Sequence, residues 1–137
     1  MSDKTELWQF YQMVKFEALE PINFRRFGVI TACNPGSEPL SDAVNAQRNR
    51  DMVAEFITKG WRYMAVNVGS PDMTWCEPSF VVEASQADLH RVSKKTQQNA
   101  YYWVDNGMLI LVPVNLAPEF QPVVIGRFEH SVVESMK

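Results

Sequence analysis

The feature that most constrains the fold is residues 29–49, where an apolar strand pattern leads through a turn into a capped helix. Residues 29–32 read Val-Ile-Thr-Ala, which is typical of a buried central strand, and the turn Asn34-Pro35-Gly36 follows at once. Ser41 then offers an N-cap hydroxyl. A helix is therefore predicted from residue 41 to about residue 58.

The predicted helix has an inward face that changes character along its length. Its C-terminal half carries the expected core residues, which are Met52, Val53, Phe56 and Ile57. Its N-terminal half places Asn45 and Asn49 on the same side, with Arg48 at the edge. A buried amide without a partner costs about 1–3 kcal/mol. These amides must therefore bond to loop backbone, water or a ligand.

Other elements follow from apolar periodicity and from turn signals. Helices are predicted over residues 4–19 and 86–97, and strands over 23–32, 61–68, 79–83, 100–104 and 108–112. Asn106-Gly107 lies between the last two strands and predicts a two-residue hairpin turn. Prolines punctuate residues 113–137, which we expect to be an irregular tail in which 123–128 is a candidate edge strand.

This order predicts a single α+β domain over residues 1–137, with its core at about 22–112. The expected architecture is a ferredoxin-like βαββαβ sandwich with an extra N-terminal helix and a C-terminal hairpin strand. Its first and third strands would lie side by side at the centre. One end of the sheet, which we call the pole, would then collect polar residues from distant segments. They are the candidate ligand-binding residues Asn34, Ser37, Asn45, Arg48, Asn49, Glu77, Gln98 and Asn99.

Composition excludes several classes of function. The net charge is −3 and the basic residues form no stripe, so no nucleic-acid partner is expected. No apolar run is long enough to span a membrane and no signal-peptide core follows the N-terminus, so we expect a cytoplasmic protein. Cys33, Cys76, His90 and His130 lack the spacing of a metal site or of a thiol with its base. We expect free thiols and no cofactor.

Several short motifs, taken together, resemble one family. They are Ile30-Thr31-Ala32-x-Asn34-Pro35, Leu40-Ser41, Asn45, Arg48-Asn49, Glu77-x-Ser79-Phe80 and Gln98-Asn99-Ala100. They are similar to the small bacterial family known as domain of unknown function 3293, over roughly residues 27–112. The resemblance implies a bacterial, single-domain, cytoplasmic protein and supplies no activity.

The polar residues of the pole have two interpretations. In the first they form a pocket, where Arg48 and the helix N-terminus attract an anion and Glu77 accepts from an amine or hydroxyl. In the second they satisfy one another, with Arg48 paired to Glu77 and the amides tying loops 33–40 and 97–99 together.

Two functions therefore remain open. One is a small polar or anionic ligand-binding domain that uses the pole; the other is a protein-interaction module, such as an inhibitor, immunity or adaptor protein, presenting an edge strand. The sequence contains no recognisable catalytic constellation. Trp75, in a loop near Glu77, is the one aromatic residue expected to be exposed and functional.

Overall fold

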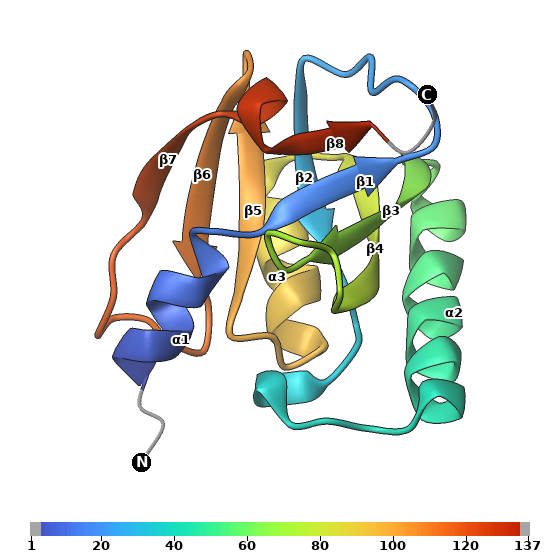
Figure 1. Ribbon diagram of the computed structural model, residues 1–137. Helices are drawn as coiled ribbons and strands as arrows, with labels where there is room; N and C mark the ends of the chain where they lie inside the picture. Colours follow the sequence, from blue (N-terminus) through green and yellow to red (C-terminus); the bar gives the residue numbers. More distant parts are fainter. Residues whose placement is uncertain (1–3, 135–137) are drawn as a thin grey trace.

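The computed structural model describes residues 4–134, which form three α-helices and an eight-stranded sheet (Figure 1). The helices are α1 (Lys4–Tyr11), α2 (Asp42–Lys59) and α3 (Gln86–Lys95). The strands are β1 (Lys15–Ala18), β2 (Arg26–Ile30), β3 (Arg62–Gly69), β4 (Cys76–Glu83), β5 (Ala100–Asp105), β6 (Met108–Pro113), β7 (Val123–Arg127) and β8 (Val132–Glu134). Two short 3-10 segments are η1 (Pro35–Ser37) and η2 (Phe128–Ser131).

The sheet has the order β7-β6-β5-β2-β4-β3-β1-β8 and curls upon itself. The predicted central pair is confirmed, because β2 and β4 are antiparallel neighbours. The two end strands, β7 and β8, are joined only by the four residues of η2, so opposite ends of the sheet must lie near each other. In Figure 1, β8 accordingly crosses in front of the central strands beside β1.

The curled sheet has two faces with separate cores. The helix face is covered by α2 and α3, whose Met52, Phe56 and Leu89 pack against strand residues such as Val82. The inner face, which the curl encloses, is filled by Phe16, Val29, Val81, Tyr102, Leu109, Leu111 and Phe128. Helix α1 packs on this inner face through Trp8. A sheet that is buried on both faces explains why β2 and β5 are apolar without alternation.

Helix α2 begins and ends as its sequence predicts. The Ser41 hydroxyl accepts from the amide of Val44 at 3.2 Å, and Gly60 closes the helix in the left-handed region at φ 73°. Met52 and Phe56 are buried as predicted. Ile57 is not a core residue, since 65% of it is exposed. No helix within residues 4–134 is long and apolar enough to cross a membrane.

The predicted helix over residues 4–19 is wrong in its second half. The helix stops at Tyr11, and residues 15–18 form β1, which pairs antiparallel with β3. Residues 14–18 fit both a helical stripe and an alternating strand, with Val14 and Phe16 buried. Pairing with the exposed edge of β3 decides between the two patterns, because a four-residue strand gains its hydrogen bonds there.

The tail over residues 113–137 is more regular than predicted in its described part. The candidate edge strand is confirmed as β7, and β8 adds a second strand, parallel to β1. The hairpin between β5 and β6 is also confirmed, with φ 51° at Asn106 and 84° at Gly107. Only a long-range partner makes β8 a strand, so local sequence does not reveal it.

Candidate functional site

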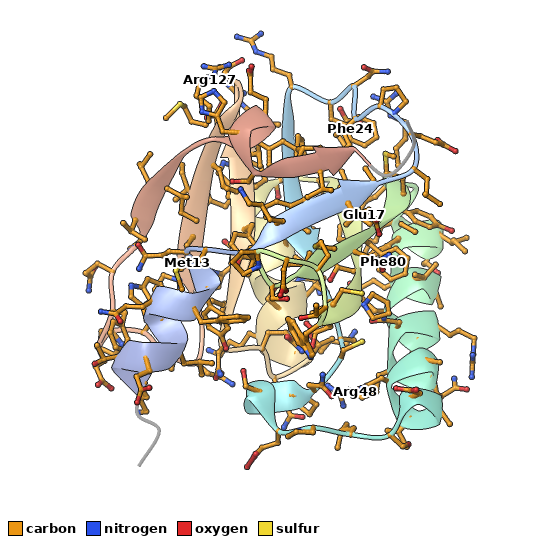
Figure 2. All side chains as sticks on the ribbon, in the orientation of Figure 1. Met13, Glu17, Phe24, Arg48, Phe80 and Arg127 are labelled. Carbon is orange, nitrogen blue, oxygen red and sulfur yellow. The ribbon has the colours of Figure 1, made fainter. Side chains whose placement is uncertain are left out.

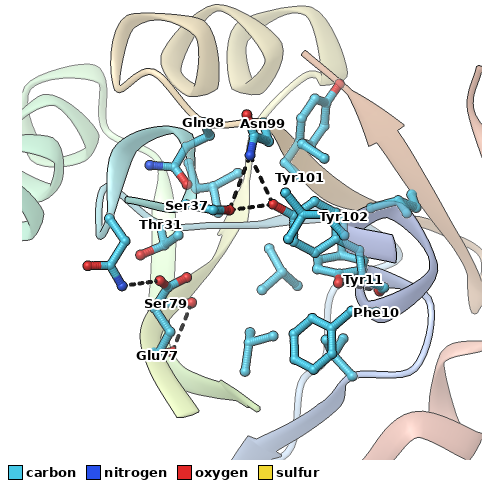
Figure 3. Close-up of a pocket in the computed structure, with 18 of the residues that line it drawn as sticks. Phe10, Tyr11, Thr31, Ser37, Glu77, Ser79, Gln98, Asn99, Tyr101 and Tyr102 are labelled. Carbon is cyan, nitrogen blue, oxygen red and sulfur yellow. Dashed lines mark hydrogen bonds between the residues drawn. The ribbon is translucent and has the colours of Figure 1, made fainter. Parts of the chain in front are cut away.

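A cavity of about 320 Å³ lies at the pole, between α1, the inner face of the sheet and the loops that follow β2 and precede β5 (Figure 3). Part of its lining is apolar, from Leu7, Phe10, Val14, Val29, Val68, Trp75 and Leu111. Polar groups are contributed by Tyr11, Asn34, Ser37, Glu77, Asn99 and Tyr102. Its volume is at the lower end of the range for small-molecule sites, which is about 300–1,000 Å³.

A cluster of three polar side chains closes one side of the cavity. The Tyr11 hydroxyl lies 2.6 Å from the Ser37 hydroxyl, and the Asn99 side-chain amide donates to both oxygens at 3.1 Å (Figure 3). Tyr102 extends the cluster by donating to the main-chain oxygen of Tyr11. The cluster therefore joins α1, η1 and the start of β5, three segments that are far apart in the sequence.

Glu77 is the acidic group of the cavity. It lies on β4 rather than before the strand predicted over residues 79–83, because the strand begins at Cys76. Its Oε2 accepts from the side-chain amide of Asn34 at 2.8 Å. Burial raises the pKa of Glu77 to about 7, and the hydrogen bond from Asn34 opposes part of this rise. The carboxyl group of Glu77 therefore changes between its protonated and ionised forms near neutral pH.

Two tyrosines share the surroundings of Glu77. Burial raises the pKa of Tyr11, and the negative charge of Glu77 adds to the rise. Burial likewise raises the pKa of Tyr102, with smaller contributions from Tyr11 and Glu77. Both hydroxyls thus stay protonated at neutral pH, so each keeps one proton to donate.

The loop that carries Asn34 and Ser37 has an unusual backbone. Asn34, Gly36 and Ser37 all have positive φ, at 46°, 61° and 66°. Such a conformation is tolerated by Asn and Gly and is unfavourable for Ser. Hydrogen bonds of the Asn34 side chain stabilise this conformation, because Asn34 Oδ1 accepts from the main-chain amide of Leu40 and the side-chain amide of Asn45.

Three of the predicted site residues lie behind the cavity wall, outside its lining. Asn45 accepts from the Asn34 main-chain amide at 2.9 Å, and Asn49 accepts from that of Ala32 at 2.9 Å. The side chain of Arg48 extends from α2 (Figure 2) and donates to the main-chain oxygens of Ala32 at 2.6 Å and Thr96 at 2.7 Å. These three residues hold the loop after β2 in place, and we call them the supporting network.

The other five predicted residues line the cavity, namely Asn34, Ser37, Glu77, Gln98 and Asn99. Gln98 also belongs to the supporting network, because its side chain donates to the Cys33 oxygen at 3.1 Å. The alternative that Arg48 pairs with Glu77 is wrong, since both bonds of Arg48 go to main-chain oxygens. The pole is thus a supporting network on one side and a cavity on the other.

Both cysteines are free thiols, as predicted. Cys33 is buried, and this burial raises its pKa, while Cys76 is exposed. His90 lies against Tyr101, with Nδ1 3.3 Å from the hydroxyl. Among residues 4–134, no three His, Cys, Asp or Glu side chains are grouped as a metal ion would require.

Sequence reasoning missed the aromatic part of the cavity. Neither Tyr11 nor Tyr102 is among the predicted site residues, yet both hydroxyls take part in the polar cluster. Trp75 was expected to be exposed, and 46% of it is exposed at the cavity rim, beside Phe10. No local signal separates these rings from core packing, because aromatic side chains dominate cores as well as binding surfaces.

A family model described as "Protein of unknown function (DUF3293)" matches residues 30–101 of this chain. The chain belongs to that family. The match begins at the last residue of β2 and ends within β5, so it spans the supporting network, Glu77 and Asn99. Tyr11 lies outside it. Comparisons with curated proteins and with solved structures gave no match.

Proposed function

We propose that this protein binds a small molecule with an apolar body and one polar end in the cavity at the pole. The observation that carries the proposal is the position of Glu77, an acidic side chain held by Asn34 inside a largely apolar cavity. Burying an acid costs free energy unless a partner compensates for it. Such a cost at a cavity wall is typical of a binding or catalytic site.

The polar end of the ligand would meet the Tyr11–Ser37–Asn99 cluster and Glu77. The cluster combines hydroxyl and amide groups, which can both donate and accept hydrogen bonds. Among the described residues that line the cavity, none is Lys, Arg or His. A polar ligand is therefore better supported than the anionic one expected from Arg48, whose guanidinium already serves two main-chain oxygens.

We propose that β2, α2, β3, β4, α3 and β5 form a ferredoxin-like core, to which the outer strands and α1 were added. The strand order β5-β2-β4-β3, with both helices on one face, supports this assignment. Under this proposal the cavity belongs to the added inner layer, and a bacterial cytoplasmic setting follows from the family resemblance.

A thermal-shift screen tests the proposed function. The probes are amines, amino acids, nucleosides, neutral sugars and sugar phosphates, each at saturating concentration. We expect at least one class to raise the Tm of the wild-type protein and to lose most of that effect in Glu77→Gln. Glu83→Gln is the matched control, because Glu83 lies on the same strand and binds Arg62 at the surface. Hits that stabilise Glu77→Gln as well as wild type would contradict the proposal.

A second candidate function is protein interaction through β7. This strand is at one end of the sheet, pairs with β6, and has Val124 58% exposed. An outer strand with an exposed valine is a suitable template for strand addition. A pull-down from the native host with wild type and Val124→Lys tests it; a partner lost only in the variant supports the interaction, and equal recovery contradicts it.

A further inference from the structure

Among the described residues that line the cavity, Glu77 has the one carboxyl group and no side chain is basic. Within residues 4–134, the Glu77 carboxyl group has one hydrogen bond, which reaches Oε2 from a neutral amide. None of the ion pairs of the described residues includes Glu77. The second oxygen, Oε1, is left for an occupant of the cavity or for water. A partner that brings a positive charge would offset the cost of burying this carboxylate.

The walls beside Glu77 suit a cation as well. Phe10 and Trp75, which both line the cavity, lie edge to face at 5.8 Å between ring centroids. Aromatic faces attract cations through their quadrupole, with Trp strongest. The oxygens of Tyr11 and Ser37 add lone pairs that accept from N–H groups. An anion would meet a carboxylate here and no basic side chain of the described lining.

We infer that the ligand of this cavity is a small organic cation, with a protonated amine that donates to Glu77 Oε1 and an apolar or aromatic body on Phe10 and Trp75. This inference rests on the proposed function and names its ligand class. The amine and the carboxylate form a charge-assisted hydrogen bond, which is shorter and stronger than a neutral one. The cavity volume of about 320 Å³ limits the body to a single ring or a short aliphatic chain.

Three probes of similar size and shape test the effect of charge alone. Benzylamine is cationic at about pH 8, benzyl alcohol is neutral and benzoate is anionic, and each is titrated by NMR into the full-length protein. At this pH Glu77, with its pKa of about 7, is ionised. The titratable side chains that interact electrostatically with it are Tyr11, Cys33 and Tyr102, whose pKa values are all raised, so these groups are neutral.

We expect benzylamine to bind most tightly and to perturb the Trp75 indole and the amides of residues 77 and 99. Glu77→Gln should weaken its binding about tenfold or more, since a hydrogen bond to a charged group is lost. Glu83→Gln, on the same strand, should bind as wild type does. Glu77→Gln is close in shape to wild type and removes a buried charge, so it should fold.

Three results would overturn the inference in distinguishable ways. If benzyl alcohol or benzoate binds at the same residues as tightly as benzylamine, the cavity is a ligand site without preference for a cation. If none of the three perturbs Trp75 or residues 77 and 99 while the wider screen also fails, the proposed function falls with the inference. Equal affinity of benzylamine for wild type and Glu77→Gln would remove the assigned role of the carboxylate.

Discussion

The side-chain amide of Asn34 donates to Glu77 Oε2 at 2.8 Å, and this bond joins the loop after β2 to the first residues of β4. Asn34 itself is held in the left-handed region, at φ 46°, by bonds from Leu40 and Asn45. Asn45, on α2, therefore helps to position the side-chain amide that donates to the acid of the cavity.

Replacements of Asn34 that remove its side-chain hydrogen bonds should lower the unfolding free energy. Asn34→Gly keeps the left-handed backbone and loses the bonds to Leu40, Asn45 and Glu77, so we expect a loss of about 1–3 kcal/mol in unfolding free energy. Asn34→Ala should lose about 1 kcal/mol more, because a Cβ is unfavourable at this φ. Urea unfolding measures both. An Ala variant as stable as the Gly variant would contradict the assigned backbone.

Arg48 should act on stability and leave ligand binding unchanged. Arg48→Met loses the two bonds to the main-chain oxygens of Ala32 and Thr96, and we expect it to cost about 2–4 kcal/mol. Arg50→Met, on the exposed side of the same helix, is the control and should cost less than about 0.5 kcal/mol. If Arg48→Lys folds normally but binds a cavity ligand more weakly than wild type, Arg48 takes part in ligand binding and this prediction is wrong.

The Tyr11 hydroxyl should matter to both the fold and the cavity. Tyr11→Phe removes one partner from Ser37 and Asn99, and we expect it to lower the unfolding free energy by about 1 kcal/mol. It should also change the affinity for any cavity ligand. Tyr63→Phe, at an exposed position on β3, is the matched control. If the two variants are equally stable and bind alike, the polar cluster has no role.

The pH dependence of stability should carry the signature of Glu77. Its pKa is raised from 4.5 to about 7 in the folded protein, so the folded state binds the extra proton between these two values. The unfolding free energy therefore falls as pH rises through this window, by at most about 3 kcal/mol from this group.

Urea unfolding from pH 5 to pH 8 measures this slope. Glu77→Gln should reduce the slope and be more stable than wild type at pH 8, because it removes the cost of a buried charge. Glu83→Gln should keep the wild-type slope, as Glu83 forms its ion pair with Arg62 at the surface. A wild-type slope in Glu77→Gln would show that another group is responsible.

Local signals were sufficient for much of the fold. Ser41 and Gly60 mark the ends of α2, and Asn106-Gly107 marks the hairpin, because caps and turns depend on the residues themselves. The element order was sufficient for the central pairing of β2 and β4. Residues 15–18 and β8 were missed because each becomes a strand only through pairing with distant chain.

The candidate site was partly accessible from the sequence for the same reason. Asn34, Glu77 and Asn99 were found because the pole collects strand ends, and the structure brings all three to one cavity. Arg48 was interpreted as an anion site because a charge on an inward helix face suggests a ligand. Its actual acceptors are main-chain oxygens, which no sequence pattern identifies. Tyr11 was missed because its partners Ser37 and Asn99 lie far from it in the sequence.

The most direct measurement of the central claim is an NMR titration of the Glu77 side-chain carboxyl carbon, assigned by comparison with Glu77→Gln. We expect a midpoint near pH 7 in the free protein, because the carboxyl group is largely removed from solvent and, among residues 4–134, accepts from one neutral donor. Saturating benzylamine should lower that midpoint, since a bound cation stabilises the carboxylate. A midpoint near 4.5 in the free protein would contradict the claim that Glu77 is the buried acid of a ligand cavity.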